Sequence, residues 1–205
     1  MLTVPNRQRP PLAMILCVYC GTGLGADPAH VDAARALGRH CAEQGIELVY
    51  GGAKVGLMGA LADAALAAGG RVTGVMPQAL VDREIAHSGL SAIHVVASMH
   101  ERKALMAELS TAFVALPGGP GTLDEIVEQW TWALLGIHAK PVGFLNVNGY
   151  FDPLRQMIGR IVAQDFLDAR FERMLVWAED PAALIERFGA YAPPPPKWSA
   201  PPGQA

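Results

Sequence analysis

Short apolar segments alternate with longer amphipathic segments along most of the chain. The apolar segments have the length of buried strands, and they span 14–20, 47–50, 71–76, 93–96, 112–116, 142–145 and, more briefly, 174–177. The intervening segments have helical character, and they span 28–44, 57–68, 99–110, 122–135, 153–163 and 181–188. In the first of these, Val31, Ala34, Leu37 and Cys41 recur at helical spacing. The alternation predicts a Rossmann-like, doubly wound α/β fold with a mainly parallel sheet and helices on both faces.

The composition indicates a single domain between two tails. Hydrophobic residues make up 51% of the 205 residues, which is enough for one substantial core. We expect this domain to span 14–190, after a polar, proline-containing leader at 1–13. The end of the chain, 191–205, is rich in proline, which cannot continue a helix or donate to a sheet, and we expect a flexible or polyproline tail.

Charge and hydropathy restrict the partners and the location. The net charge of −3 argues against nucleic-acid binding driven by bulk electrostatics. No apolar run approaches the roughly 18 residues that span a membrane. The leader lacks the arrangement of a secretory signal, so a cytoplasmic location is expected.

Three cysteines, an odd number, fit reduced thiols. Cys17 and Cys20 have C-x-x-C spacing, but they lie within the first predicted strand. Residues three apart on a strand point to opposite faces, so we expect no redox pair here.

Glycine-rich or charged segments follow each of the first five predicted strands. They are GTGLG at 21–25, GGAKVGLMG at 51–59, DRE at 82–84, SMHERK at 98–103 and PGGPGT at 117–122. Ligands of doubly wound folds bind beyond the carboxyl ends of the strands, where these segments would gather. Neither the dinucleotide fingerprint nor a P-loop is present, which leaves a pocket for a small phosphorylated ligand such as a mononucleotide.

The segment 117–125, PGGPGTLDE, allows two interpretations. Backbone N–H groups of Gly118, Gly119 and Gly121 suit a phosphate, but glycines also serve an ordinary tight turn. Thr122 and Glu125 form a T-x-x-E pattern, which is typical of a capping box at a helix start. On pattern alone the cap is the better account of Glu125, and a catalytic carboxylate is the alternative.

An S-x-x-E pattern formed by Ser98 and Glu101 predicts a second capping box. It places Arg102 and Lys103 in the first turn of a helix, where cations oppose the helix dipole. A residue pair placed against a local preference indicates function, and a solvated pair is the alternative. The neighbouring His100 is a candidate acid or base on chemistry alone.

The predicted helix at 122–135 is apolar nearly all round. One face would pack on the sheet, and a homodimer interface is the simplest cover for another. Thr131 lies among these apolar residues. Glu84 falls in a polar loop after the third strand, where surface glutamates are common.

Taken together, YGGAKVGLMG, MHERKALMAE, PGGPGTLDE and KPVGFLNVNGYFDPL, in this order, closely resemble the "lonely guy" family. Members are cytokinin riboside 5′-monophosphate phosphoribohydrolases, and older ones were mislabelled lysine decarboxylases. The resemblance runs from about 16 to 188. It implies hydrolysis of the N-glycosidic bond of a nucleoside 5′-monophosphate, including AMP, to a free base and ribose 5-phosphate. It also implies a homodimer and no metal or other cofactor.

Carried across residue by residue, the resemblance implies catalytic roles for Arg102 and Glu125. The positions that it implies in substrate binding are Glu84, Lys103, Gly119, Pro120, Gly121, Thr122, Leu123, Asp124 and Thr131. From the residues themselves, Asp124 is expected only to favour the helix start.

The chain departs from the family pattern at Pro120, at Ala53 and in the first loop, CGTGLG, and these departures bear on substrate preference. A non-catalytic carrier of a nucleotide or cofactor and a general purine or pyrimidine monophosphate nucleosidase remain alternatives.

Overall fold

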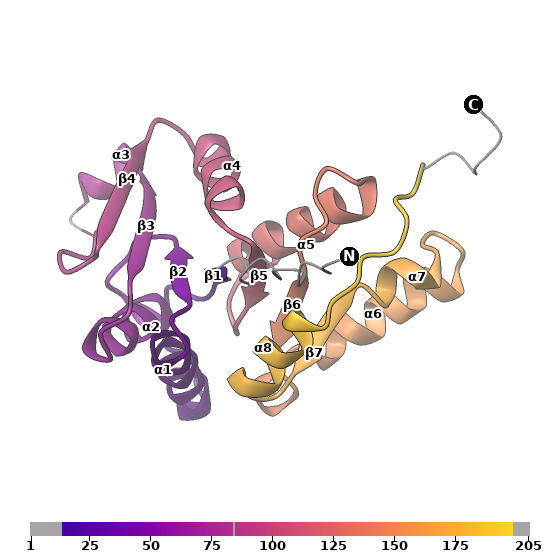
Figure 1. Cartoon of the computed structure of the whole chain (residues 1–205), viewed down its shortest axis with the longest axis horizontal. Coiled ribbons are helices and arrows are strands. Elements are labelled where there is room, and N and C mark those ends of the chain that lie inside the picture. The colour runs from indigo at the N-terminus through magenta and orange to yellow at the C-terminus, as the bar shows by residue number, and fades with distance from the viewer. Residues whose placement is uncertain (1–13, 84, 199–205) are drawn as a thin grey trace, which may run out of the picture.

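Seven parallel strands form one sheet at the centre of the computed structural model, which describes residues 14–83 and 85–198 (Figure 1). The predicted leader, Glu84 and positions 199–205 of the predicted tail lie outside the described residues. The strand order is β4-β3-β2-β1-β5-β6-β7. The strands are β1 Ile15–Tyr19, β2 Glu47–Tyr50, β3 Val72–Pro77, β4 Ala92–Val96, β5 Ala112–Ala115, β6 Val142–Leu145 and β7 Leu175–Ala178. The predicted fold class is confirmed.

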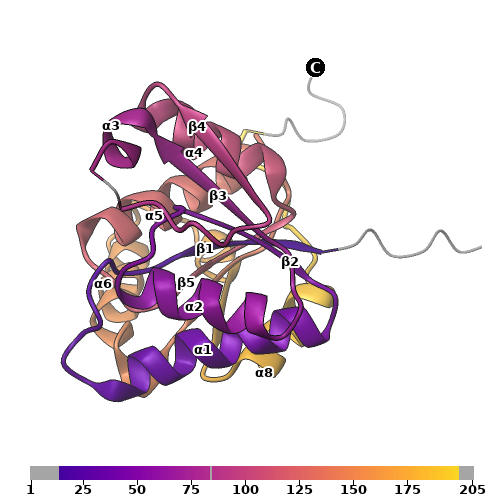
Figure 2. The same ribbon diagram turned by 90° about the vertical axis from the view of Figure 1, so that its left-hand side faces the viewer.

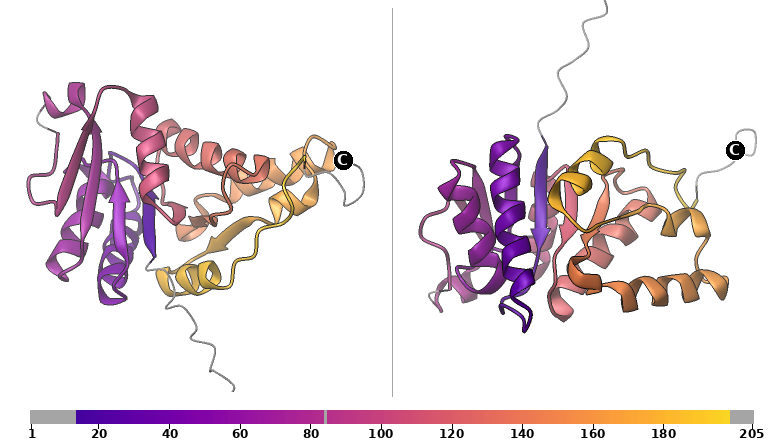
Figure 3. Two further views of the ribbon diagram at one scale, coloured as in Figure 1. Left: turned by 45° about the horizontal axis from the view of Figure 1, so that its top comes forward. Right: turned by 90° about the horizontal axis from the view of Figure 1, so that it is seen from below.

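Helices cover both faces of the sheet (Figure 2 and Figure 3). One face is covered by α1 Pro28–Glu43, α2 Gly56–Ala67 and α8 Pro181–Gly189, and the other by α4 Met99–Leu109, α5 Pro120–Leu135 and α6 Asp152–Ala163. Three short elements were not predicted, namely α3 Gln78–Val81, the 3₁₀ turn η1 Val147–Gly149 and α7 Ala169–Glu172. They lie in connections, where one turn of helix leaves no hydrophobic periodicity.

The helix ends follow local sequence signals. The side chain of Asp27 caps α1 by accepting the Ala29 N–H, and proline follows at the first helical position. Gly136 ends α5 in the left-handed conformation, with a φ of 80°. The start of α5 differs from expectation, because the helix begins at Pro120 and not at Thr122.

Side chains of β1 alternate between two cores. Leu16, Val18 and Cys20 pack on the side of α1 and α2, whereas Cys17 and Tyr19 pack on the side of α4 and α5. Cys17 and Cys20 are therefore buried on opposite faces as free thiols, as the strand pattern predicts. Burial raises the pKa of the Cys17 thiol to about 12, so it stays protonated at neutral pH.

The strand order reverses between β1 and β5. The chain runs outward from β1 through β2, β3 and β4 on one side, and through β5, β6 and β7 on the other. Tyr19 pairs with Ala115, so the loops that follow β1 and β5 begin side by side. The Gly21 N–H donates to the Pro117 carbonyl at 3.1 Å and joins the two loops. Ligands of doubly wound folds bind at such a switch point.

The described part of the predicted tail lies against the end of α5. Positions 191–198 contain no helix or strand, and the Lys197 N–H donates to the Leu134 carbonyl at 2.9 Å. Among the described residues, no helix is both long and apolar enough to cross a membrane.

Candidate active site

A cavity of about 330 Å³ opens at the carboxyl ends of β1, β2, β3 and β5. Its polar side chains include Arg102 from α4, with Thr122 and Glu125 from α5. The remaining lining residues are Cys20, Gly21, Thr22, Gly51, Ala53, Met58, Met76, Leu80, Ile85, Met99, Gly119, Pro120 and Gly121. Residues from four of the five segments that the sequence places beyond the strands thus meet at one site, whereas Asp82 and Arg83 of the DRE segment do not line it.

Backbone carbonyl groups hold the side chain of Arg102. Its Nε donates to the Val75 carbonyl at 3.1 Å, and its Nη2 donates to the Gly51 carbonyl at 3.3 Å. Only 9% of the side chain is exposed, so the interpretation of a solvated Arg/Lys pair is wrong for this residue. A Cβ atom at Gly51 would overlap the guanidinium, which explains the need for glycine there. These acceptors are neutral, so the positive charge remains available to the cavity.

Glu125 points its carboxylate toward that charge. Oε1 lies 3.9 Å from Arg102 Nη1, which is an ion pair but too long for a hydrogen bond. The side chain is 12% exposed, and desolvation raises its pKa to about 6 although Arg102 opposes the shift. Glu125 is therefore mainly ionised at neutral pH, and its oxygens are not consumed by a tight, bidentate pair.

The T-x-x-E pattern does not form a capping box. Gly119 is the N-cap of α5, and Pro120 occupies the first turn without a side-chain cap. Thr122 is buried within the first turn, and its side chain packs over Gly118, where a Cβ atom would overlap the threonine hydroxyl. The prediction of a cap at Thr122 is wrong because α5 begins at Pro120, which places Thr122 inside the helix and not at its N-cap.

The S-x-x-E pattern does cap α4. Ser98 Oγ accepts the Glu101 N–H at 3.2 Å, and Glu101 Oε2 accepts the Ala97 N–H at 2.9 Å. The predicted capping box is confirmed, with the carboxylate reaching one residue beyond the usual N-cap N–H.

Lys103 lies outside the cavity lining. Its Nζ binds Asp124 at 3.1 Å and Glu128 at 3.0 Å, which fastens α4 to α5. This contact uses Asp124, which the residue pattern suggested was only a helix-start acid.

Three further candidates from the sequence also lie away from the lining. Thr131 is exposed, and its hydroxyl donates a hydrogen bond within its own helix, to the Val127 carbonyl at 2.8 Å. Leu123 packs against the core beneath α5, and His100 is exposed. Gly119, Pro120, Gly121 and Thr122 line the cavity as a group.

The sequence did not reveal the apolar wall of the site. Met58, Met76, Leu80, Ile85 and Met99 line the cavity, and they come from five separate elements or loops. Apolar residues in a strand or helix give the same pattern whether they face a core or a ligand. Their placement became visible only with the fold.

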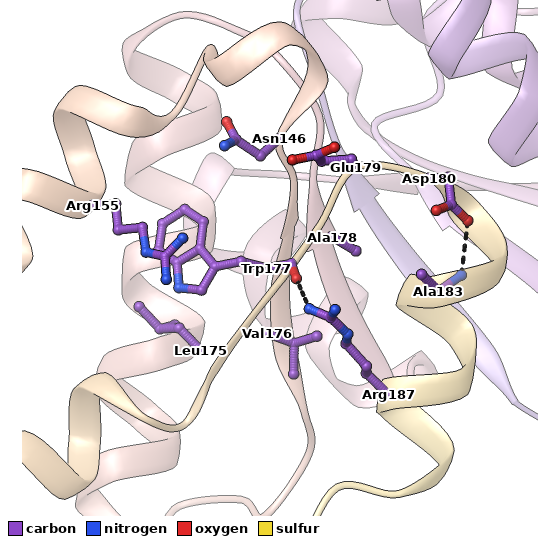
Figure 4. A pocket seen from close by; sticks show the side chains of 10 residues that line it. All are labelled: Asn146, Arg155, Leu175, Val176, Trp177, Ala178, Glu179, Asp180, Ala183 and Arg187. Carbon is purple, nitrogen blue, oxygen red and sulfur yellow. Dashed lines mark hydrogen bonds between the residues drawn. The ribbon is translucent and has the colours of Figure 1, made fainter.

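A larger hollow, of about 600 Å³, lies at edge strand β7 (Figure 4). The residues that line it contact one another. Arg187 donates to the Trp177 backbone carbonyl, and the Arg155 guanidinium lies 5.5 Å from the centre of the Trp177 ring. None of the described candidates from the sequence lines this hollow. Size therefore does not select the candidate site, and we choose the cavity at the switch point because Arg102 and Glu125 meet there.

Metal coordination finds no support in the arrangement of side chains. Within 14–83 and 85–198 no cluster of three or more His, Cys, Asp or Glu residues is placed to hold a metal ion.

Comparison with known proteins gives consistent relatives. Residues 58–188 match the family model described as "Possible lysine decarboxylase". The chain is 45% identical over 178 residues to a probable cytokinin riboside 5′-monophosphate phosphoribohydrolase of Oryza sativa subsp. japonica, covering 87% of this chain and 71% of that one. It is 44% identical over 178 residues to a cytokinin riboside 5′-monophosphate phosphoribohydrolase of Arabidopsis thaliana, covering 87% and 82% respectively.

Solved structures share the fold at lower identity. The molybdenum cofactor carrier protein of Chlamydomonas reinhardtii superposes with a TM-score of 0.67 and 22% identity, over 88% of this chain and 100% of that one. A molybdenum cofactor binding protein of Rippkaea orientalis gives 0.66 and 22%, over 88% and 98%.

Proposed function

Because the chain belongs to the family of the cytokinin riboside 5′-monophosphate phosphoribohydrolases, we propose that Arg102 and Glu125 hydrolyse the N-glycosidic bond of a nucleoside 5′-monophosphate. The products are a free base and ribose 5-phosphate. The observation that carries the assignment is the buried Glu125 carboxylate, which faces Arg102 in a cavity at the switch point of the sheet.

The carboxylate of Glu125 suits the charge that develops during the reaction. Cleavage of the bond to the base leaves positive charge on the ribose ring, as in glycoside hydrolysis. One opposite charge at about 4 Å is worth roughly 4 kcal/mol at an effective dielectric constant near 20. Glu125 stabilises this charge, or it orients the attacking water and the ribose hydroxyls.

Arg102 positions the carboxylate without neutralising it. Its guanidinium is fixed by two backbone carbonyls, and the gap of 3.9 Å to Glu125 leaves the carboxylate oxygens open to the substrate. A rigid charge of this kind needs no reorganisation during the reaction.

In this proposal the phosphate binds at the N-terminus of α5, on Gly119, Gly121 and Thr122. Free N–H groups and the helix dipole favour an anion there, and Pro120 removes one donor while fixing the backbone. Binding energy from this remote group then serves the reacting bond.

In this proposal the base binds against the apolar wall, of which Met76 and Met99 are part. Methionine side chains adapt to flat rings of different size. AMP and adenosine monophosphates with an N6 substituent both fit this description. A general purine or pyrimidine monophosphate nucleosidase differs only in the base, and a comparison of base release from AMP, N6-isopentenyl-AMP and UMP separates these cases.

Glu125→Gln tests the catalytic assignment. We expect release of adenine from AMP to fall by about 10²–10⁴-fold, since the substitution removes the charge and keeps the shape. Glu128→Gln is the matched control one turn along α5, where the carboxylate binds Lys103 outside the cavity. Equal activity of the Glu125 variant and the wild type would refute the assignment.

A non-catalytic carrier is the second candidate, and the fold shared with molybdenum cofactor carrier proteins favours keeping it. A carrier of an anion gains little from a buried carboxylate beside its ligand, which favours the enzyme. Incubation of AMP with the wild type followed by chromatography distinguishes the two. Intact, bound AMP indicates a carrier, and free adenine with ribose 5-phosphate indicates the hydrolase.

A cytoplasmic homodimer completes the proposal. Thr131 lies on the outer face of α5, with its side chain exposed and the half-buried Trp132 beside it. A second copy packed on this face would cover these residues, and it is the arrangement in which Thr131 could meet a substrate. Light scattering after size exclusion tests the dimer, and Thr131→Arg is expected to weaken it.

A further inference from the structure

Tyr150 reaches the turn before α5 from a distant part of the chain. It follows η1, and its hydroxyl donates to the Gly118 carbonyl at 2.7 Å. The tyrosine ring stands edge-on to His30, with centres 5.4 Å apart, and edge-on to Phe151 at 5.0 Å. The ring is thus supported on two sides, and the hydroxyl reaches the glycine turn from a fixed position.

The bond to the Gly118 carbonyl sets the plane of the next peptide group. A trans peptide is planar, so its carbonyl and its N–H point in opposite directions. A Gly118 carbonyl held toward Tyr150 therefore turns the Gly119 N–H away from Tyr150. Gly119 lines both the site cavity and the cavity that Tyr150 lines, so an N–H turned away from Tyr150 faces the site cavity, where the phosphate is proposed to bind.

A second cavity lies on the Tyr150 side of the turn. It has a volume of about 520 Å³ and is lined by Tyr150, His30 and Gly118 among others. This cavity meets the site cavity at Gly21, Thr22 and Gly119, which line both. Thr122 and Gly21 pack closely against Gly118, and the tyrosine hydroxyl adds the hydrogen bond that holds the Gly118 carbonyl on the side of this second cavity.

We propose that Tyr150 is a positioning residue for the substrate phosphate, because its hydroxyl orients the Gly118–Gly119 peptide so that the Gly119 N–H faces the phosphate. The inference rests on the proposed function, in which the phosphate binds at the start of α5. It gives a role to Tyr150 in the KPVGFLNVNGYFDPL segment, for which the sequence alone suggested none.

The test is Tyr150→Phe, which removes the hydroxyl and keeps the ring contacts. We expect KM for AMP to rise about tenfold with kcat nearly unchanged, since one hydrogen bond that orders a charged contact is lost. The inhibition constant of ribose 5-phosphate rises by the same factor, and that of adenosine, which has no phosphate, stays as in the wild type. Tyr191→Phe, at a half-buried tyrosine beyond α8, is the matched control.

Two results overturn the inference. One is an unchanged KM for AMP together with unchanged inhibition by ribose 5-phosphate. The other is an equal loss of affinity for ribose 5-phosphate and adenosine, which assigns Tyr150 to the general shape of the site. Tyr150 is 42% exposed, so the variant is expected to fold, and thermal unfolding verifies this. Neither result bears on the hydrolase assignment, which the Glu125→Gln variant tests separately.

Discussion

The turns that begin α4 and α5 share a sequence pattern and differ in structure. Ser98 caps α4, and Glu101 folds back to the Ala97 N–H in the first turn. Thr122 caps nothing, and Glu125 faces Arg102 across the cavity. Glu101 therefore caps its own helix, whereas the carboxylate of Glu125 remains open to the cavity.

The two turns differ in sequence two residues before the threonine, where α5 has a proline. Proline is favoured at the first helical position, because its fixed φ suits a helix and its missing N–H is not needed there. Pro120 occupies the first position of α5, so Thr122 lies inside the helix and Glu125 falls in the second turn, beyond reach of the N-cap. No proline precedes Ser98 within its turn, and the pattern there forms the cap that it predicts.

Gly51→Ala is expected to lower activity strongly, because it displaces Arg102, the partner of Glu125 in the α5 turn. The new methyl group overlaps the Arg102 guanidinium and the end of Met58. Arg102 must move, and a shift of about 1 Å in a positioned group lowers activity by about 10²-fold. The rate of adenine release from AMP measures the loss.

Gly189→Ala provides the control, since a Cβ atom there meets no neighbour. Activity of Gly51→Ala within twofold of the wild type would show that the fixed position of Arg102 is unimportant.

Glu125→Gln is expected to raise stability at neutral pH. Burial raises the folded-state pKa of Glu125 from 4.5 to about 6, so the folded protein holds this proton more tightly than the unfolded chain does. The wild type loses stability as the pH rises through 4.5–6, by on the order of 2 kcal/mol. The variant lacks this titration, so its advantage should appear near pH 7 and vanish near pH 4.

Urea unfolding at several pH values measures this difference. An advantage that is independent of pH would contradict a buried carboxylate, and the α5 turn would then resemble the α4 turn.

Much of the fold could be predicted from the sequence, because its signals are local. Apolar strands of four to six residues alternate with helices, and the glycines and charges follow the strands. The pairing of Arg102 with Glu125 could not be derived from the pattern. The two residues lie on different helices, and the order of the strands in the sheet decides which helices come together. Lys103 follows Arg102 directly but points to Asp124 and Glu128, outside the cavity. The side chains of Arg102 and Lys103, adjacent in the sequence, thus lie on different faces of α4.

Ser98→Ala should destabilise the protein where Thr122→Val does not. The first removes a side-chain cap, which costs about 1 kcal/mol. The second removes a hydroxyl that caps nothing, although it is expected to weaken phosphate binding. The free energy of unfolding of the two variants measures the contrast. A loss of 1 kcal/mol or more from Thr122→Val, with none from Ser98→Ala, would reverse the assignment of the two turns.

Pro120→Ala is expected to have the smallest effect, and it tests why the turns that begin α4 and α5 differ. Alanine restores conformational freedom to the unfolded chain, which lowers stability by roughly 0.4–1 kcal/mol where the proline is unstrained. Helix α5 should still begin at the same place, because packing of Thr122 over Gly118 and the approach of Glu125 to Arg102 both hold it there. Activity should therefore stay within a few-fold of the wild type.

If proline alone keeps Glu125 out of a capping box, the variant will instead lose activity as severely as Glu125→Gln while its stability is maintained or rises. Adenine release and urea unfolding, measured on the same preparation, decide between packing and proline as the cause of the difference between the two turns.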